Sequence, residues 1–169
     1  MKTLWLMCGL PGSGKSTWAK SQKSAIRVSR DEIRFSLLKD GEEYFSHEDE
    51  AFKKWIEELA AALNRSDNVL ADATHLTTGS RKKIINAVRA AGVVCDFGVV
   101  VFETPVGICK ERNAKRTGRE LVPDYIIDRW ARDFTDPAAD NFTYSKILRV
   151  NSAGQMINPA EYKKLTKYS

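Results

Sequence analysis

The chain has 169 residues, 43% of them apolar, which suffices for one buried core and lies within the size range of a single domain. No stretch approaches the roughly 20 apolar residues of a membrane helix, and the apolar run at residues 4–8 is too short for a signal sequence. A net charge of +5 suits a polyanionic partner, although ordinary solubility charge explains it as simply. We therefore expect a single cytoplasmic domain without a membrane partner. The three cysteines have no paired spacing, so neither a disulfide framework nor a zinc site is indicated.

Apolar runs alternate with helix-compatible segments along the chain. Strands are predicted at residues 2–8, 25–29, 69–73, 93–102 and 147–150. The clearest helices are predicted at residues 16–20, 47–64, 80–91 and 123–134. This alternation predicts an α/β fold, in which a parallel sheet is flanked by helices on both faces and binds ligands at the carboxyl ends of its strands. Residues 1–150 are expected to form the domain, and residues 151–169 a polar tail.

Three helix starts carry local signals. Ser29 and Glu32 have the spacing of a capping box, and Thr104 precedes Pro105 as a cap precedes a first helical residue. A basic stretch at residues 115–119 leads to another proline-initiated helix at Pro123. This arrangement predicts a helical hairpin with a lid at about residues 110–123.

The segment from Gly9 to Ser16 fits the pattern G-x-x-x-x-G-K-[ST] without a mismatch, between an apolar strand and a helix. Such a loop points its backbone N–H groups at phosphate oxygens. Lys15 is expected to reach the β- and γ-phosphates of ATP, and Ser16 to ligate Mg²⁺. The residues expected to hold ATP are Gly9, Gly12, Ser13, Gly14, Lys15, Ser16 and Thr17. The alternative, a chance glycine turn, does not account for the flanking strand and helix.

Candidate acceptor residues follow the second strand. Asp31 and Arg34 are three residues apart at a helix start, so they project from one face toward the carboxyl edge of the sheet. The carboxylate can accept a hydroxyl proton, and the guanidinium can hold an acceptor phosphate. The alternative is a surface ion pair of Asp31 with Arg30 or Arg34.

The third strand ends in Asp72, Ala73, Thr74 and His75. Asp72 is expected either to bind Mg²⁺ through water or to cap the following loop. Thr74 and His75 are candidate acceptor contacts. His75 has no companion histidine or cysteine at ligand spacing, which favours hydrogen bonding over metal ligation.

The lid candidates are basic. Arg112 and Arg116 are four residues apart, beside Lys115 and Arg119. A closing arginine supplies positive charge to the γ-phosphate during transfer, whereas a merely solvated basic face is the alternative. We expect Arg112 to contact ATP and Arg116 to be catalytic.

Taken together, these motifs resemble the 5′-kinase domain of the polynucleotide kinase family, in the same order over roughly the first 135 residues. The resembling segments are Cys8 to Ala19, Ser29 to Arg34, Thr74 to Leu76, and Arg112 to Arg116 with Val122 and Pro123. The resemblance implies a P-loop kinase fold that uses ATP and Mg²⁺, in which Lys15 and Ser16 handle the ATP phosphates. It further implies that Asp31 is the general base for a nucleic-acid 5′-hydroxyl, that Arg34 grips the acceptor 3′-phosphate, that Arg116 stabilises the transferring group and that Thr74 lies near the acceptor phosphate.

Two departures from the family pattern stand out. His75 replaces a usual asparagine, which affects the expected acceptor contacts, and the Asp-x-Asp-Gly-Thr motif of a 3′-phosphatase domain is absent, as in a stand-alone kinase. The sequence thus favours an ATP-dependent kinase of DNA or RNA 5′-hydroxyl ends. The alternatives are a kinase of a small-molecule hydroxyl, such as a nucleoside, sugar or antibiotic, and an ATP-responsive binding module. A homo-oligomer is possible but not indicated.

Overall fold

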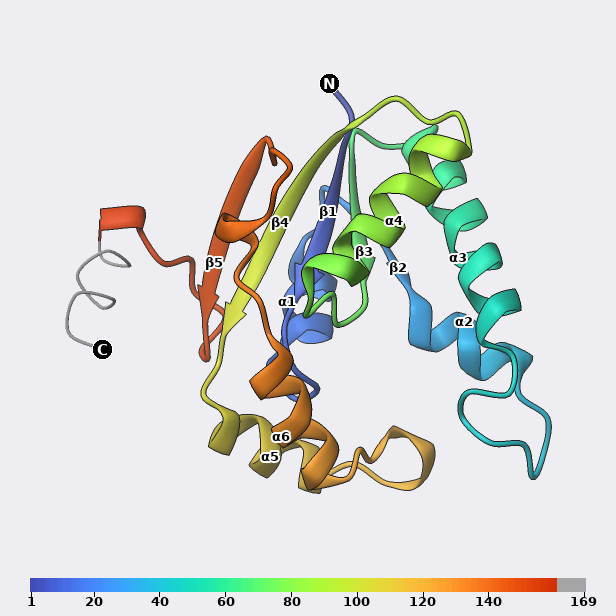
Figure 1. The fold of residues 1–169 in the computed structure, drawn as a ribbon, viewed down its shortest axis with the longest axis vertical. Coiled ribbons are helices and arrows are strands. Elements are labelled where there is room, and N and C mark those ends of the chain that lie inside the picture. The colour runs from blue at the N-terminus through green and yellow to red at the C-terminus, as the bar shows by residue number, and fades with distance from the viewer. Residues whose placement is uncertain (161–169) are drawn as a thin grey trace.

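The computed structural model describes residues 1–160, and the predicted strands all form within them. They are β1 (Thr3–Cys8), β2 (Ile26–Ser29), β3 (Asn68–Asp72), β4 (Asp96–Glu103) and β5 (Lys146–Asn151). All pairings between these strands are parallel, in the order β2-β3-β1-β4-β5. Their carboxyl ends therefore point to one edge, as the arrowheads in Figure 1 show. The predicted α/β fold with a parallel sheet is confirmed.

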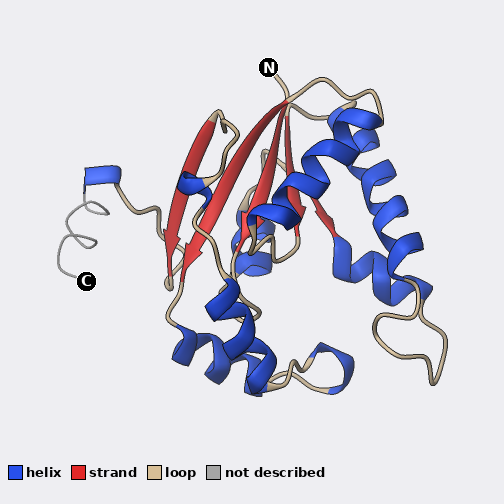
Figure 2. Cartoon of the chain, viewed as in Figure 1, coloured by secondary structure: helices blue, strands red, loops and turns tan. Residues whose placement is uncertain are grey.

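Helices cover both faces of this sheet and one of its edges. The described helices are α1 (Lys15–Ser21), α2 (Arg30–Leu37), α3 (Glu48–Leu63), α4 (Thr78–Ala90), α5 (Val106–Ala114) and α6 (Asp124–Asp133). Two short 3₁₀ turns, η1 (Gly118–Glu120) and η2 (Pro137–Ala139), lie after α5 and α6. In Figures 1 and 2, α3 and α4 lie on one side of the sheet and α1 on the other, while α5 and α6 lie beyond the carboxyl edge.

The alternation of side chains along β1 explains its continuous apolar sequence. Leu4 and Leu6 point into the larger core, which they share with Trp55 of α3, whereas Met7 points into a smaller core on the α1 side. All four side chains are at most 1% exposed. Because successive residues of a strand face opposite sides, a strand buried on both faces must be apolar throughout.

Two predicted helix caps differ in detail from the sequence-based expectation. Ser29 caps α2 by accepting the N–H of Glu32 at 3.2 Å, but the Glu32 side chain pairs with Arg27 instead of closing the capping box. Pro105, not Thr104, is the N-cap of α5. The Thr104 hydroxyl instead donates to the Ser13 carbonyl at 2.8 Å, which ties the end of β4 to the glycine loop.

The chain turns back immediately after β5 and does not leave the domain at residue 151. The Asn151 N–H donates to the Gln155 carbonyl, the Ile157 N–H donates to the Arg149 carbonyl, and Val150 bridges Met156. Part of the expected tail, residues 161–169, lies outside the described residues. In the part of the chain that the structure describes, no helix has the length and apolarity needed to cross a membrane.

Candidate active site

The loop between β1 and α1 needs glycine at two positions. Gly12 and Gly14 have φ values of +79° and +95°, in the left-handed region that other residues rarely adopt. A Cβ at Gly12 would also lie 2.4 Å from the Cys109 carbonyl oxygen of α5. The loop is therefore pressed against the lid helix, and Gly14 forms the N-cap at the positive end of α1.

Lys15 is the charged centre of this loop. It is 9% exposed, and its ammonium donates to the carbonyl oxygens of Gly9 and Leu10 at 2.9 Å each. Burial lowers the pKa of Lys15; the negative charges of Asp72 and Asp31 oppose this shift, and the positive charge of Arg116 adds to it. The structure therefore brings the charges of these predicted site residues together around Lys15.

Asp72 lies at the end of β3 beside the loop. It is 5% exposed, and its Oδ2 accepts hydrogen bonds from the Ser16 hydroxyl at 3.0 Å and from Nε of Arg27 at 2.7 Å. These partners come from α1 and β2 and not from the following loop, which favours the Mg²⁺ interpretation over capping.

Ser16 and Asp72 fit a magnesium ion that binds with ATP. Residues 1–160 contain no cluster of three or more histidine, cysteine, aspartate or glutamate side chains placed to hold a metal. Magnesium in nucleotide sites needs no such cluster, since one or two protein oxygens suffice when phosphates and water complete its shell. The adjacent hydroxyl and carboxylate supply oxygens of this kind.

The acceptor candidates Asp31 and Arg34 lie together and bind one another. Arg34 donates through Nη1 to Asp31 and to the Tyr44 hydroxyl, and the Tyr44 hydroxyl donates to Asp31 at 2.5 Å. Glu48 accepts from both Nε and Nη2 of Arg34. The Arg34 side chain is 7% exposed, whereas that of Asp31 is 63% exposed. The ion pair given as the alternative thus exists, but it leaves the carboxylate open to solvent.

Thr74 and His75 occupy different environments. Thr74 is half-buried, and its carbonyl accepts the N–H of Gly9 at 3.0 Å, next to the phosphate loop. His75 is 5% exposed, stacks on Trp55 and binds the Met7 carbonyl through Nδ1 at 2.8 Å. This placement does not fit the expected acceptor contact, because the core encloses the ring. Burial is the largest cause that lowers the pKa of His75 to about 4.

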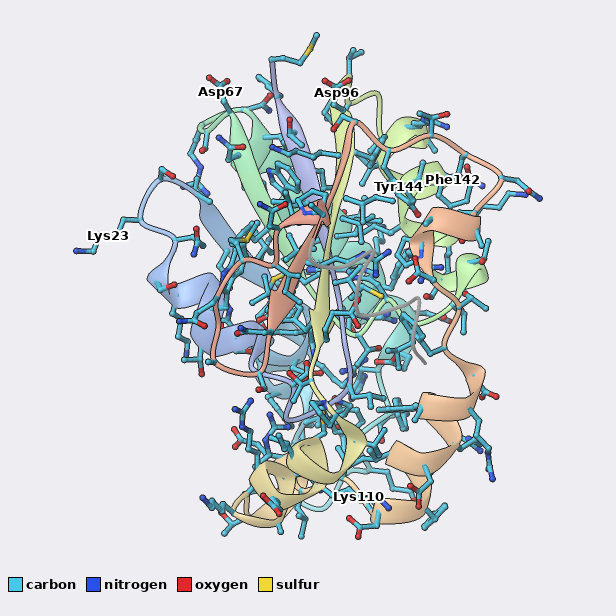
Figure 3. The ribbon with its side chains drawn as sticks, turned by 90° about the vertical axis from the view of Figure 1, so that its left-hand side faces the viewer. Lys23, Asp67, Asp96, Lys110, Phe142 and Tyr144 are labelled. Atoms are coloured by element: carbon cyan, nitrogen blue, oxygen red, sulfur yellow. The ribbon has the colours of Figure 1, made fainter. Side chains whose placement is uncertain are left out.

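The segment that the sequence predicts as a lid forms a hairpin of α5 and α6. Asn113, 1% exposed, exchanges two hydrogen bonds with the backbone of Val122, and Lys110 of α5 pairs with Asp128 of α6 at 2.6 Å. Figure 3 places Lys110 at the end of the molecule opposite Asp67 and Asp96, which flank the amino ends of the strands. The lid therefore stands over the carboxyl edge, where the glycine loop lies.

A cavity of about 550 Å³ opens beside the glycine loop, between α1, the lid helix α5 and the turn at residues 151–154. Its walls include Trp18, Phe102, Arg112 and Arg116. Arg112 also donates to the Ser152 carbonyl at 2.7 Å, which joins the lid to the turn. The volume suits a nucleotide-sized ligand. Both predicted lid arginines thus face the cavity where an ATP molecule would extend from the loop.

Sequence reasoning missed several residues of the site. Tyr44 and Glu48, which fix Arg34 and Asp31, follow them by ten or more residues and carry no recognisable spacing. Thr104 was expected to cap a helix and binds the loop instead. The turn at residues 151–154 had a usable signal, since it contains Asn151, Ser152 and Gly154, which are residue types common in tight turns.

Several known proteins are similar to this chain in sequence or in fold. The family model AAA_33, described as an AAA domain, matches residues 4–137. A protein of Autographa californica nuclear polyhedrosis virus, named as a bifunctional polynucleotide kinase/RNA ligase, is 32% identical over an alignment of 165 positions, which covers 89% of this chain and 22% of that protein. The chain therefore spans about a fifth of this relative.

Two solved structures illustrate the range of similar folds. A chain of the Pnkp1/Rnl/Hen1 RNA repair complex is 27% identical with a TM-score of 0.65, and the match covers 78% of this chain and 43% of that one. A sugar kinase from Janibacter sp. HTCC2649 is 15% identical with a TM-score of 0.56 over 98% and 93% of the two chains, which shows a shared fold alone. With its intact phosphate loop and a family match over most of its length, the chain belongs to the AAA_33 family as a P-loop kinase domain.

Proposed function

We propose that this domain transfers the γ-phosphoryl group of ATP to the 5′-hydroxyl end of DNA or RNA. The observation that carries the proposal is the exposed carboxylate of Asp31, which lies close enough to influence Lys15 electrostatically and is bonded to Arg34. A carboxylate in this position can activate a hydroxyl opposite the γ-phosphate. The guanidinium beside it suits an acceptor that itself carries a phosphate.

ATP binding would rearrange few groups in the loop. The backbone N–H groups of residues 9–16 would hold the phosphate oxygens, and Lys15 would exchange the Gly9 and Leu10 carbonyls for the β- and γ-phosphates. Ser16 and Asp72 would hold Mg²⁺, which neutralises charge on the phosphates when it is bound. Arg112 and Arg116 would lie along the nucleotide from the lid side.

In the proposed transfer step, one bond to the γ-phosphorus forms as another breaks. Asp31 accepts the proton of the acceptor hydroxyl, whose oxygen forms a bond to the γ-phosphorus while the bond between the γ-phosphorus and the bridging oxygen breaks and ADP leaves. Arg116 would stabilise the charge on the transferring group. Glu48, which holds Arg34 through two nitrogens, keeps the guanidinium beside Asp31.

Three observations favour a nucleic-acid acceptor. The viral relative is assigned as a polynucleotide kinase, and a similar structure belongs to an RNA repair complex. The chain is also basic, with a net charge of +5. The second candidate, phosphorylation of a small-molecule hydroxyl, is supported by the sugar kinase only through its fold.

The test is transfer of label from γ-labelled ATP with Mg²⁺ to a short 5′-hydroxyl oligonucleotide. Asp31→Asn is expected to lower kcat by roughly a hundredfold or more, because a positioned base typically contributes that much. Asp49→Asn is the control, since Asp49 is another exposed carboxylate in the first turn of a neighbouring helix, α3. Nearly equal losses in both variants would refute the assignment of Asp31.

A salt series separates the two candidate acceptors. The KM of a polyanionic acceptor should rise steeply with salt concentration, because binding releases counterions. Tight ATP binding without transfer to any oligonucleotide would overturn the nucleic-acid acceptor and favour the small-molecule kinase.

A further inference from the structure

We propose that the exposed ring of Phe45, braced by Tyr44, is a stacking subsite for the 5′-terminal base of the acceptor strand. The inference rests on the proposed function and deepens it. Both aromatic residues belong to the loop at residues 38–47, which joins α2 to α3. Neither residue was singled out by the sequence.

Phe45 is an exposed aromatic residue held in a fixed setting. Its side chain is 61% exposed, although a phenylalanine gains most when it is buried. Its ring meets that of Tyr44 edge to face, with centroids 4.6 Å apart, and Tyr44 in turn meets Phe35 of α2 at 5.6 Å. The loop thus presents one ring of an aromatic cluster to solvent, where a ligand can reach it.

The proposed subsite adjoins the acceptor groups directly. The Tyr44 hydroxyl donates to Asp31 at 2.5 Å, so the neighbouring ring of Phe45 lies within reach of the nucleotide whose hydroxyl Asp31 would activate. The Arg34 guanidinium carbon is 4.5 Å from the Tyr44 centroid and 5.6 Å from that of Phe45. Aromatic faces interleaved with arginine match the alternating bases and phosphates of a nucleic-acid strand.

The lid borders the same entrance. Arg119 of η1 donates to the Lys39 carbonyl at 3.1 Å, which joins the lid segment to the start of the loop at residues 38–47. Lys39 and Arg119 place positive charge on this side of the loop, which also carries the carboxylates of Asp40, Glu42 and Glu43. A sugar or antibiotic acceptor would have less use for such a combination, since it offers neither a stacking base nor a polyanionic chain.

Stacking on Phe45 also constrains the state of the acceptor end. A base can place its face on an aromatic ring only when that face is free, so the terminal base must be unpaired or must fray. The domain should therefore prefer single-stranded or overhanging 5′-hydroxyl ends over blunt ends.

The experiment compares two oligonucleotide acceptors that differ only in the presence of the 5′-terminal base, the second having an abasic sugar at that position. For the wild-type protein, kcat/KM should be about 5- to 150-fold higher with the base, the range expected for one stacked base. Phe45→Ala should bring the ratio close to one, and Phe45→Trp should preserve it. Val94→Ala, an exposed apolar residue just before β4 at the opposite edge of the sheet, is the matched control.

The outcomes separate the subsite from the proposed function. Wild-type transfer that does not depend on the terminal base would overturn the subsite and leave the kinase proposal intact. A base-dependent ratio that persists in Phe45→Ala would also overturn the subsite. Wild-type protein that phosphorylates neither oligonucleotide would remove both proposals. Thermal unfolding of each variant checks that the exposed substitutions leave the fold unchanged.

Discussion

Replacing Asp140 with asparagine should destabilise the fold by about 3–5 kcal/mol, because it leaves a buried guanidinium without its counter-charge. Asp140 and Arg81 both have side chains that are 0% exposed, and they bind through two nitrogen–oxygen contacts of 2.7 and 2.9 Å. Arg81 further donates to the carbonyl oxygens of His75 and Thr135 at 2.8 Å each. The pair thus ties the end of β3, beside the phosphate loop, to the segment that follows α6.

The expected loss is a large fraction of the roughly 5–15 kcal/mol that stabilises a typical domain. It would be measured by urea unfolding at pH 7 for Asp140→Asn, Arg81→Met and the double variant. Since the two residues share contacts, the double variant should lose about 1–3 kcal/mol less than the sum of the single losses.

The matched control is the lid pair of Lys110 and Asp128, whose side chains are 30% and 48% exposed. Asp128→Asn should cost less than about 1 kcal/mol, because solvent screens an exposed pair. Additive losses at Arg81 and Asp140 would show that the two side chains are not coupled, and a loss at Asp140 no larger than that at Asp128 would contradict the penalty for burying an unpaired guanidinium.

Three further predictions concern His75, the glycine loop and the metal site. Burial lowers the pKa of His75 to about 4, so the unfolded chain, with a pKa near 6.5, takes up the proton first as the pH falls. This contribution to the free energy of unfolding is fully present above pH 6.5, and about 3 kcal/mol of it should be lost as the pH falls from 6.5 to 4. His75→Asn should flatten the pH profile of the unfolding free energy. Equal profiles for the wild type and the variant would contradict this prediction. Gly12→Ala should weaken binding of an ATP analogue by roughly tenfold or more, since its Cβ would meet the Cys109 carbonyl. The control is Gly41→Ala, which has a similar φ of +80° but lies in open space and should leave the affinity unchanged. Equal affinities of the two variants in calorimetry would disprove the close contact. Asp72→Asn should raise the Mg²⁺ concentration for half-maximal transfer by roughly tenfold, and an unaltered magnesium titration would exclude Asp72 from the metal site.

The sequence was sufficient for features that neighbouring residues encode. The glycine loop is eight consecutive residues whose backbone geometry follows from Gly12 and Gly14, and the strands follow from apolar runs. The expected strand before Asp96 began three residues too early, because Val93 to Cys95 are apolar but precede the pairing of β4 with β1. Local composition cannot show at which residue a strand first pairs with its neighbour.

Other features depend on contacts between distant residues. Arg81 and Asp140 are 59 positions apart, and nothing in either local sequence indicates a buried pair. Glu48 fixes Arg34 from a different helix. His75 was placed at the acceptor because it follows Thr74 at a strand end, yet a φ of +43° turns the chain there and the ring stacks on Trp55 in the core. The position of this ring depends on the backbone turn and on the distant Trp55, neither of which the local sequence shows.

The strand order explains why the ATP-binding loop and the residues for the acceptor lie close together. Ser29 of β2 pairs with Asp72 of β3, and β3 lies directly beside β1, whose end leads into the glycine loop. Neighbouring strands are about 4.8 Å apart, so the helix start that carries Asp31 lies two strand spacings, roughly 10 Å, from the phosphate loop, with Asp72 between them.

That distance leaves room for a phosphoryl group and a metal ion between Asp31 and the phosphate loop. It is set by the spacing of the strands and not by the identity of the acceptor. Kinases that share the fold can therefore share this distance between base and phosphate loop while they act on different hydroxyls. The choice of acceptor must come from residues outside the sheet, and in this chain the loop at residues 38–47 places Tyr44 and Phe45 where they can make it.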